Sequence, residues 1–70
     1  MATLIEFIDA NGNVLRRHQY GNKDQMHMRP MIGDRLEIDY CFYDVKQVTI
    51  KVPTSSEDQT EVFVKVHSVL

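Results

Sequence analysis

The residues of this chain best suited to chemistry are one cysteine and three histidines. Cys41 could act as a nucleophile, with His18, His27 or His67 as its base. Nucleophilic catalysis requires thiol and base within hydrogen-bond reach, a third group that orients the base, and a cleft. No spacing in the sequence brings a histidine to Cys41. We therefore expect a buried or half-buried structural thiol, no catalytic residue and no enzyme activity.

Two further groups carry the ligand types of a metal site. The segment Met26-His27-Met28, with Met31 nearby, has the soft ligands that Cu(I) prefers. Glu37 and Asp39 share one face of an expected strand, with Asp44 close in sequence, and could hold a hard cation or serve acid–base chemistry. No established ligand spacing accompanies either group, so a partly buried extended segment and a solvated charged edge explain them better. We expect no metal and no cofactor.

Length and charge limit the classes of protein that the chain can be. Seventy residues, 43% of them hydrophobic, predict one folded domain spanning residues 1–70. The net charge of −2 argues against a dedicated nucleic-acid binder. Residues 10–35 nevertheless hold five Arg and Lys against two Asp, a net +3, whereas residues 36–70 hold three Lys against six acids, a net −3.

The sequence also indicates a compartment. A single cysteine provides no disulfide framework, which small secreted domains commonly need. Charge interrupts the N-terminal apolar residues, so we expect no signal peptide and no membrane span. The predicted location is the cytoplasm, with no membrane partner.

Apolar and polar residues alternate in five runs separated by turn signals, a pattern typical of β-strands. Asp9-Ala10-Asn11-Gly12-Asn13 predicts a tight hairpin in which Gly12 adopts a positive φ and Asp9 caps the loop. Gly33-Asp34 predicts a second turn that leads into a strand. The expected strands are Thr3–Asp9, Val14–Tyr20, Leu36–Tyr40, a long run that Pro53 closes, and Thr60–Val69.

Two places in this pattern need special geometry. Cys41-Phe42-Tyr43-Asp44 is expected to turn or bend, and residues 21–29 to form an irregular loop. Tyr43 and Val45 occupy odd-numbered positions, whereas Val48 and the apolar residues after it occupy even-numbered ones. In a regular strand these two sets would face opposite sides of the sheet. A β-bulge near Lys46-Gln47 would turn both sets inward.

These elements predict an all-β fold: a small five-stranded antiparallel roll or partly open barrel, Src-homology-3-like, without a substantial helix. The run Pro30-x-x-Gly33-Asp34-x-Leu36-x-Ile38, followed by Tyr43-x-Val45-x-x-Val48, resembles a pattern in small uncharacterised β-barrel proteins of phages and mobile elements. The resemblance implies the fold and no activity.

Aromatic residues are the best candidates for a functional surface. Because successive side chains of a strand point to opposite faces, Phe63 and one of Phe42 or Tyr43 should point outward. There they could anchor a protein partner or a second copy of the chain. We therefore predict a non-enzymatic interaction or oligomerisation module that uses Phe42, Tyr43 and Phe63.

The alternative is a small nucleic-acid-binding barrel. In that case arginines of the second strand and the following loop would hold phosphates while aromatic rings stack on bases. The residues concerned are Arg16, Arg17, Arg29 and Arg35.

Overall fold

The structure is a computed structural model of the chain, and it describes residues 3–20, 30–54 and 59–69. The predicted irregular loop at residues 21–29 lies outside this part, and with it Arg29 and the segment Met26-His27-Met28.

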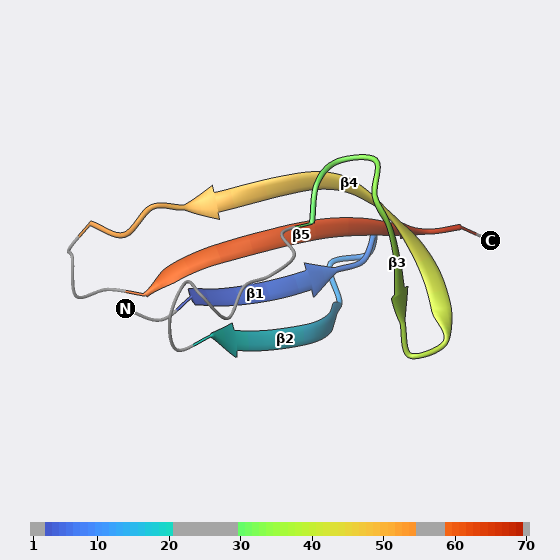
Figure 1. The fold of residues 1–70 in the computed structure, drawn as a ribbon, viewed down its shortest axis with the longest axis horizontal. Helices are drawn as coiled ribbons and strands as arrows, with labels where there is room; N and C mark the ends of the chain where they lie inside the picture. The colour runs from blue at the N-terminus through green and yellow to red at the C-terminus, as the bar shows by residue number, and fades with distance from the viewer. Residues whose placement is uncertain (1–2, 21–29, 55–58, 70) are drawn as a thin grey trace.

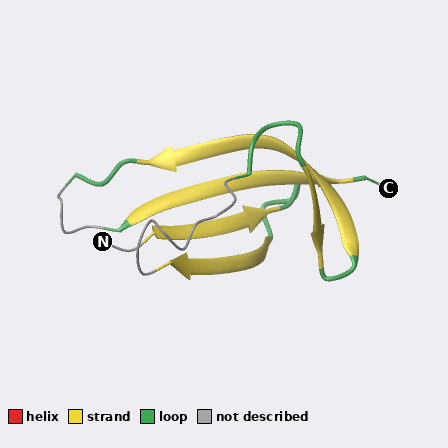
Figure 2. Cartoon of the chain, in the orientation of Figure 1, coloured by secondary structure: helices red, strands yellow, loops and turns green. Residues whose placement is uncertain are grey.

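All regular structure in the described residues is β-strand (Figures 1 and 2). The predicted all-β class with five strands is confirmed. The strands over residues 3–8, 41–51 and 60–68 are rich in β-branched or aromatic residues, which fit a pleated surface. The strands are β1 (Thr3–Ile8), β2 (Val14–Tyr20), β3 (Arg35–Ile38), β4 (Cys41–Lys51) and β5 (Thr60–Ser68).

The five strands form one curled sheet in the order β2-β1-β5-β4-β3. Neighbouring strands are antiparallel except for β1 and β5, which are parallel and lie at the centre. The sheet is therefore mixed, where a wholly antiparallel roll was predicted. It curls without closing, because β2 and β3 remain its two edges (Figure 1).

The β1–β2 turn has the geometry that its sequence predicts. Gly12 adopts φ +87°. One carboxylate oxygen of Asp9 accepts the backbone N–H groups of Asn11 and Asn13, both at 2.9 Å. Gly33, in the turn before β3, also has a positive φ, +98°.

The β3–β4 turn differs from the prediction. Ile38 pairs directly with Cys41, so Asp39 and Tyr40 form a two-residue hairpin loop with φ +51° and +69°. Positive φ at both central residues is the signature of a type I′ turn, which matches the twist of the flanking strands. Cys41-Phe42-Tyr43-Asp44 is consequently strand and not a turn.

The predicted bulge is confirmed. Val45 pairs with Val66 and Gln47 pairs with Lys65, so Lys46 is an extra residue without a partner on β5. Because of this insertion, Val45 and Val48 face the same side of the sheet despite their different parity.

The core lies on one face of the sheet, hereafter the inner face. Five aliphatic side chains there are at most 1% exposed, and half-buried apolar residues pack around them. The opposite, outer face carries the alternate residues of β5, including Phe63 and Lys65. The five core residues are Ile5, Val45, Val62, Val64 and Val66.

Candidate functional site

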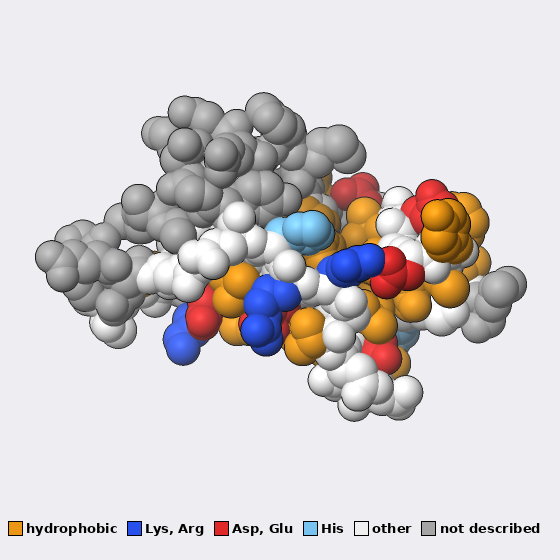
Figure 3. All heavy atoms as spheres, turned by 90° about the horizontal axis from the view of Figure 1, so that it is seen from below, with side chains coloured by type: hydrophobic (Ala, Val, Ile, Leu, Met, Phe, Trp, Pro, Cys, Tyr) orange, Lys and Arg blue, Asp and Glu red, His pale blue; other side chains and the backbone are white. Residues whose placement is uncertain are grey.

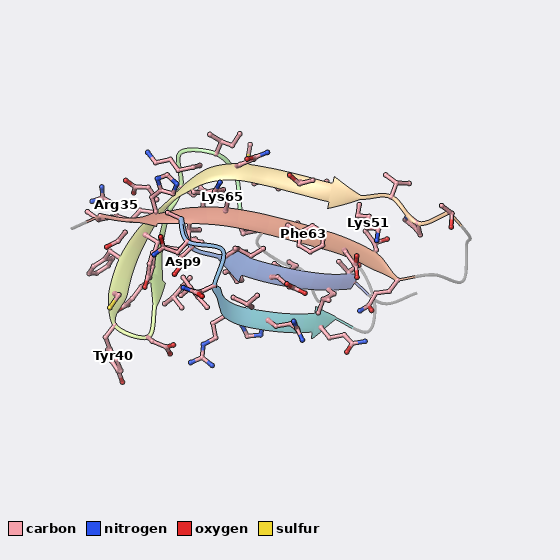
Figure 4. All side chains as sticks on the ribbon, turned by 180° about the vertical axis from the view of Figure 1, so that it is seen from behind. Asp9, Arg35, Tyr40, Lys51, Phe63 and Lys65 are labelled. Carbon is pink, nitrogen blue, oxygen red and sulfur yellow. The ribbon has the colours of Figure 1, made fainter. Side chains whose placement is uncertain are left out.

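An apolar surface surrounds the tip of the β3–β4 hairpin. Tyr40 is 94% exposed, Phe42 is 54% exposed and Val69 is 38% exposed. Val69 lies beside Phe42, since its N–H donates to the Phe42 carbonyl oxygen at 3.1 Å. We call Tyr40, Phe42 and Val69 the hairpin patch. Hydrophobic side chains gather at this end of the molecule in Figure 3, and Figure 4 places Tyr40 at the hairpin tip.

A hollow of about 320 Å³ lies within this surface, and all three patch residues line it. Arg35 also lines it, but its guanidinium Nε donates to Asp44 Oδ1 at 3.0 Å. The cation beside the hollow is therefore matched by an anion, and the hollow suits an apolar or aromatic group better than a charged one. The remaining lining residues are Cys41, Tyr43 and Ser68.

The backbone of Tyr40 is strained. A side chain at φ +69° crowds the following carbonyl, which costs about 1–2 kcal/mol outside glycine, asparagine and aspartate. With 94% of its surface exposed, the ring gains little packing within the chain to offset this cost. Strain of this kind concentrates at functional sites.

The predicted interaction residues separate in the structure. Phe42 belongs to the hairpin patch, whereas Tyr43 is half-buried and packs on the core. Phe63 is half-buried on the outer face, opposite Glu6 and Thr49. Thr49 follows Phe42 by seven residues of β4, a distance of roughly 20 Å along the strand. Phe42 and Phe63 therefore cannot serve one small contact surface.

Sequence reasoning does not select Tyr40 or Val69 as interaction residues, although Tyr40 is one of the aromatic residues of the chain. The sequence pattern places Tyr40 at the end of the expected strand Leu36–Tyr40, because no glycine marks the turn and Asp39 is the only local signal for it. Val69 is the last described residue, and only its pairing with Phe42 reveals its place in the patch.

The arginines proposed for nucleic acid are also separated. Arg16 forms an ion pair with Asp39, and Arg17 Nε lies 3.3 Å from Glu6 Oε1. Arg16 and Arg17 are consecutive in β2 and so face opposite sides of the sheet. Arg35 lies on the opposite edge strand, paired with Asp44, as described above. Within the described residues these guanidinium groups form no common basic surface.

The other chemical candidates are not assembled either. Among residues 3–20, 30–54 and 59–69, no three His, Cys, Asp or Glu side chains gather as a metal site would require. Cys41 is exposed, where a buried or half-buried thiol was predicted, because it directly follows the hairpin turn. The His18 and Phe7 rings lie edge to face, with centroids 6.5 Å apart.

The outer face has its own hollow, of about 440 Å³, between the β1–β2 turn and β5. Phe63 and Ile8 supply its apolar part, and Thr49, Gln47 and Lys65 its polar part. Lys65 forms no ion pair with another described residue. The aromatic residue of this hollow, Phe63, is half-buried, whereas the hairpin patch has two exposed aromatic residues. The hairpin patch is therefore the better candidate for an interaction surface.

No family model matches the chain, and neither a curated protein nor a solved structure does. The resemblance to phage and mobile-element barrels therefore stays a prediction. The part of the chain that the structure describes contains no helix long and apolar enough to cross a membrane.

Proposed function

We propose that this protein is a non-enzymatic interaction module that associates with a second copy of itself through the hairpin patch. The observation that carries the proposal is Tyr40, a bulky aromatic residue at φ +69° with 94% of its surface exposed. An isolated chain gains little from that arrangement. An interface that buries the ring would offset the strain.

A second copy is the occupant that the patch itself supports. The patch presents a projecting ring, Tyr40, directly beside a hollow walled by Phe42 and Val69. In a two-fold dimer the same surface meets itself, so each Tyr40 can enter the hollow of the other copy. The small core also favours association, because a chain of this length buries only about 60% of its unfolded surface when it folds alone.

The nucleic-acid alternative has less support. Phosphate binding needs several cations on one surface, while Arg16, Arg17 and Arg35 each have an acidic partner and occupy three different places. We place the module in the cytoplasm, in keeping with one exposed, free cysteine in the described residues.

Sedimentation velocity over a range of concentrations tests the proposal. The wild-type chain should approach twice its 8.2 kDa mass as concentration rises, with little dependence on salt. Phe42→Glu should remain monomeric and folded, because it places a charge in the apolar hollow. Ile32→Glu is the matched control, since Ile32 is 70% exposed and lies outside the patch. A wild-type chain that stays monomeric at millimolar concentration would overturn self-association.

A further inference from the structure

The outer edge of β4 is longer than the strand that pairs with it. β4 has eleven residues, and β3, with four, pairs only with residues 41–44. The preceding turn adds two backbone hydrogen bonds at Val45, which donates to the Asp34 carbonyl and accepts the N–H of Gly33. Beyond Val45, no described strand lies on this side of β4 (Figure 1). Within the described part of the chain, residues 46–51 therefore present a backbone edge of about 20 Å without a neighbouring strand.

Side chains along this edge combine apolar and cationic groups. Ile50 is 43% exposed and the adjoining Val52 is 76% exposed. Lys46 and Lys51 stand at the two ends, both exposed. Lysines on an edge oppose pairing with a like-charged strand, and an antiparallel second copy would bring these lysines near each other. The same charges attract a strand that carries carboxylates.

The end of β4 that adjoins β5 holds polar and charged groups. A hollow of about 380 Å³ lies where β4 ends, lined in part by Lys51, Gln59 and Glu61. Gln59 Nε2 is buried there and has no hydrogen-bond partner among the described residues. Lys51 Nζ lies 3.6 Å from Glu61 Oε2, a long contact between an exposed lysine and a half-buried glutamate. Because Gln59 Nε2 is buried and lies on the β5 side of β4, it cannot meet a chain bound to the open edge, whereas the exposed Lys51 can.

We propose that the outer edge of β4, residues 46–51, binds an extended segment of a partner protein by strand addition. The segment has β-branched residues at its centre, opposite Val48 and Ile50, and a carboxylate at each end. Main-chain hydrogen bonds supply affinity in this binding mode, and the flanking charges supply specificity. The inference rests on the proposed role as an interaction module but uses a surface separate from the hairpin patch.

A synthetic peptide tests the proposal directly. The probe is acetyl-Glu-Val-Thr-Val-Thr-Val-Glu-amide, titrated into the ¹⁵N-labelled full chain. Amide shifts and slowed hydrogen exchange should concentrate at residues 46–51. Lys46→Glu should weaken binding about tenfold, because it reverses a charge at the end of the edge. Arg17→Glu is the matched control: it makes the same charge change on β2, three strands from β4 in the sheet, and should weaken binding less than about threefold.

Two further probes isolate the backbone and charge contributions. Methylation of alternate peptide nitrogens should abolish binding when it blocks one edge of the peptide and leave it intact when it blocks the other. A probe with lysine in place of both glutamates should not bind. No binding by the original probe, equal binding by the lysine probe, or shifts centred elsewhere would overturn the proposal.

Titration of the Phe42→Glu variant separates this inference from self-association. If edge binding persists in that variant, the edge is a site whether or not the hairpin patch forms a dimer. If dimerisation is observed while the probe fails to bind, only the edge proposal is wrong.

Discussion

Tyr40 combines a costly backbone conformation with an exposed ring, so its replacement should separate stability from association. Tyr40→Gly removes the penalty of φ +69° and should raise the free energy of unfolding by about 0.5–1 kcal/mol. The same change removes the ring and should weaken dimerisation. Chemical denaturation and sedimentation measure the two effects. Tyr40→Phe, which keeps the ring and the strain, should alter neither. A less stable Tyr40→Gly would show that the ring packs within its own chain.

Gly12 differs from Tyr40, because its residue type and its place in the turn sequence already predict a positive φ. Its φ is +87° and nothing lies within 4 Å of the position that a Cβ would occupy, so a substitution there is opposed by backbone conformation alone. Gly12→Val should lower the free energy of unfolding by roughly 1 kcal/mol or more. Gly12→Asn should cost less, because asparagine tolerates a positive φ. Equal denaturation midpoints for Gly12→Val and the wild type would contradict the turn geometry.

Asp9 links the same turn to pH. The backbone N–H of Asn13 foremost, with the side chain of Asn13 and the N–H groups of Asn11 and Gly12, stabilises the charged carboxylate and lowers its pKa below the ordinary value. A lowered pKa in the folded state contributes stability above the unfolded-state pKa, and this contribution is lost as pH falls through the folded-state pKa. Asp9→Ala should therefore flatten the acid side of the stability profile. If NMR titration showed the Asp9 carboxyl to have a pKa at or above its ordinary value, the predicted lowering would be refuted.

The roles of some of these residues can be predicted from the sequence, and the roles of others cannot. Asp9 and Gly12 act through neighbours two to four positions away, so residue type and spacing suffice to predict their roles. The positive φ of Tyr40 could not be predicted in this way, because tyrosine rarely adopts a positive φ and its presence does not indicate a turn. Tyr43, predicted to face a partner, packs on the core because the true turn lies earlier than the expected one.

At the scale of elements, the bulge at Lys46 determines which residues of β4 face inward. Deletion of Lys46 would restore a strict two-residue period and turn either Val45 or Val48 away from the core. We expect the deletion to lower the free energy of unfolding by roughly 2 kcal/mol or more, whereas Lys46→Ala should be nearly neutral. Thermal and urea denaturation of both variants measure this. A deletion variant as stable as Lys46→Ala would exclude the bulge.

Strand positions were predictable because hydrophobic alternation is local, and the bulge followed from a break in that alternation. Strand pairing was not predictable in the same way. β1 and β5 lie at opposite ends of the sequence, and their parallel pairing depends on how two hairpins meet. The short length of β3 was also hidden, since Asp39 and Tyr40 continue a plausible strand pattern.

The whole molecule is a single open sheet with a small core and two unequal edges. Five fully buried aliphatic residues stabilise it. Because so small a core gives a small free energy of unfolding, even a modest loss of buried surface removes a large fraction of that free energy. The Arg16–Asp39 ion pair joins the edge strand β2 to the β3–β4 turn across the open side. Both groups are more than half exposed, with side-chain exposures of 53% and 61%. Asp39→Asn should therefore change the free energy of unfolding by less than about 1 kcal/mol. A larger loss would mean that this contact holds the curl of the sheet.

In the proposed dimer Tyr40 of one copy occupies the hollow of the other, and an isotope-filtered NOE experiment tests this contact most directly. A mixed dimer of ¹³C-labelled and unlabelled chains should give intermolecular NOEs from the Tyr40 ring to the Val69 methyl groups and the Phe42 ring. The same signals should vanish in Phe42→Glu. Intermolecular NOEs from a different surface, or none in a sample with the mass of a dimer, would contradict the account.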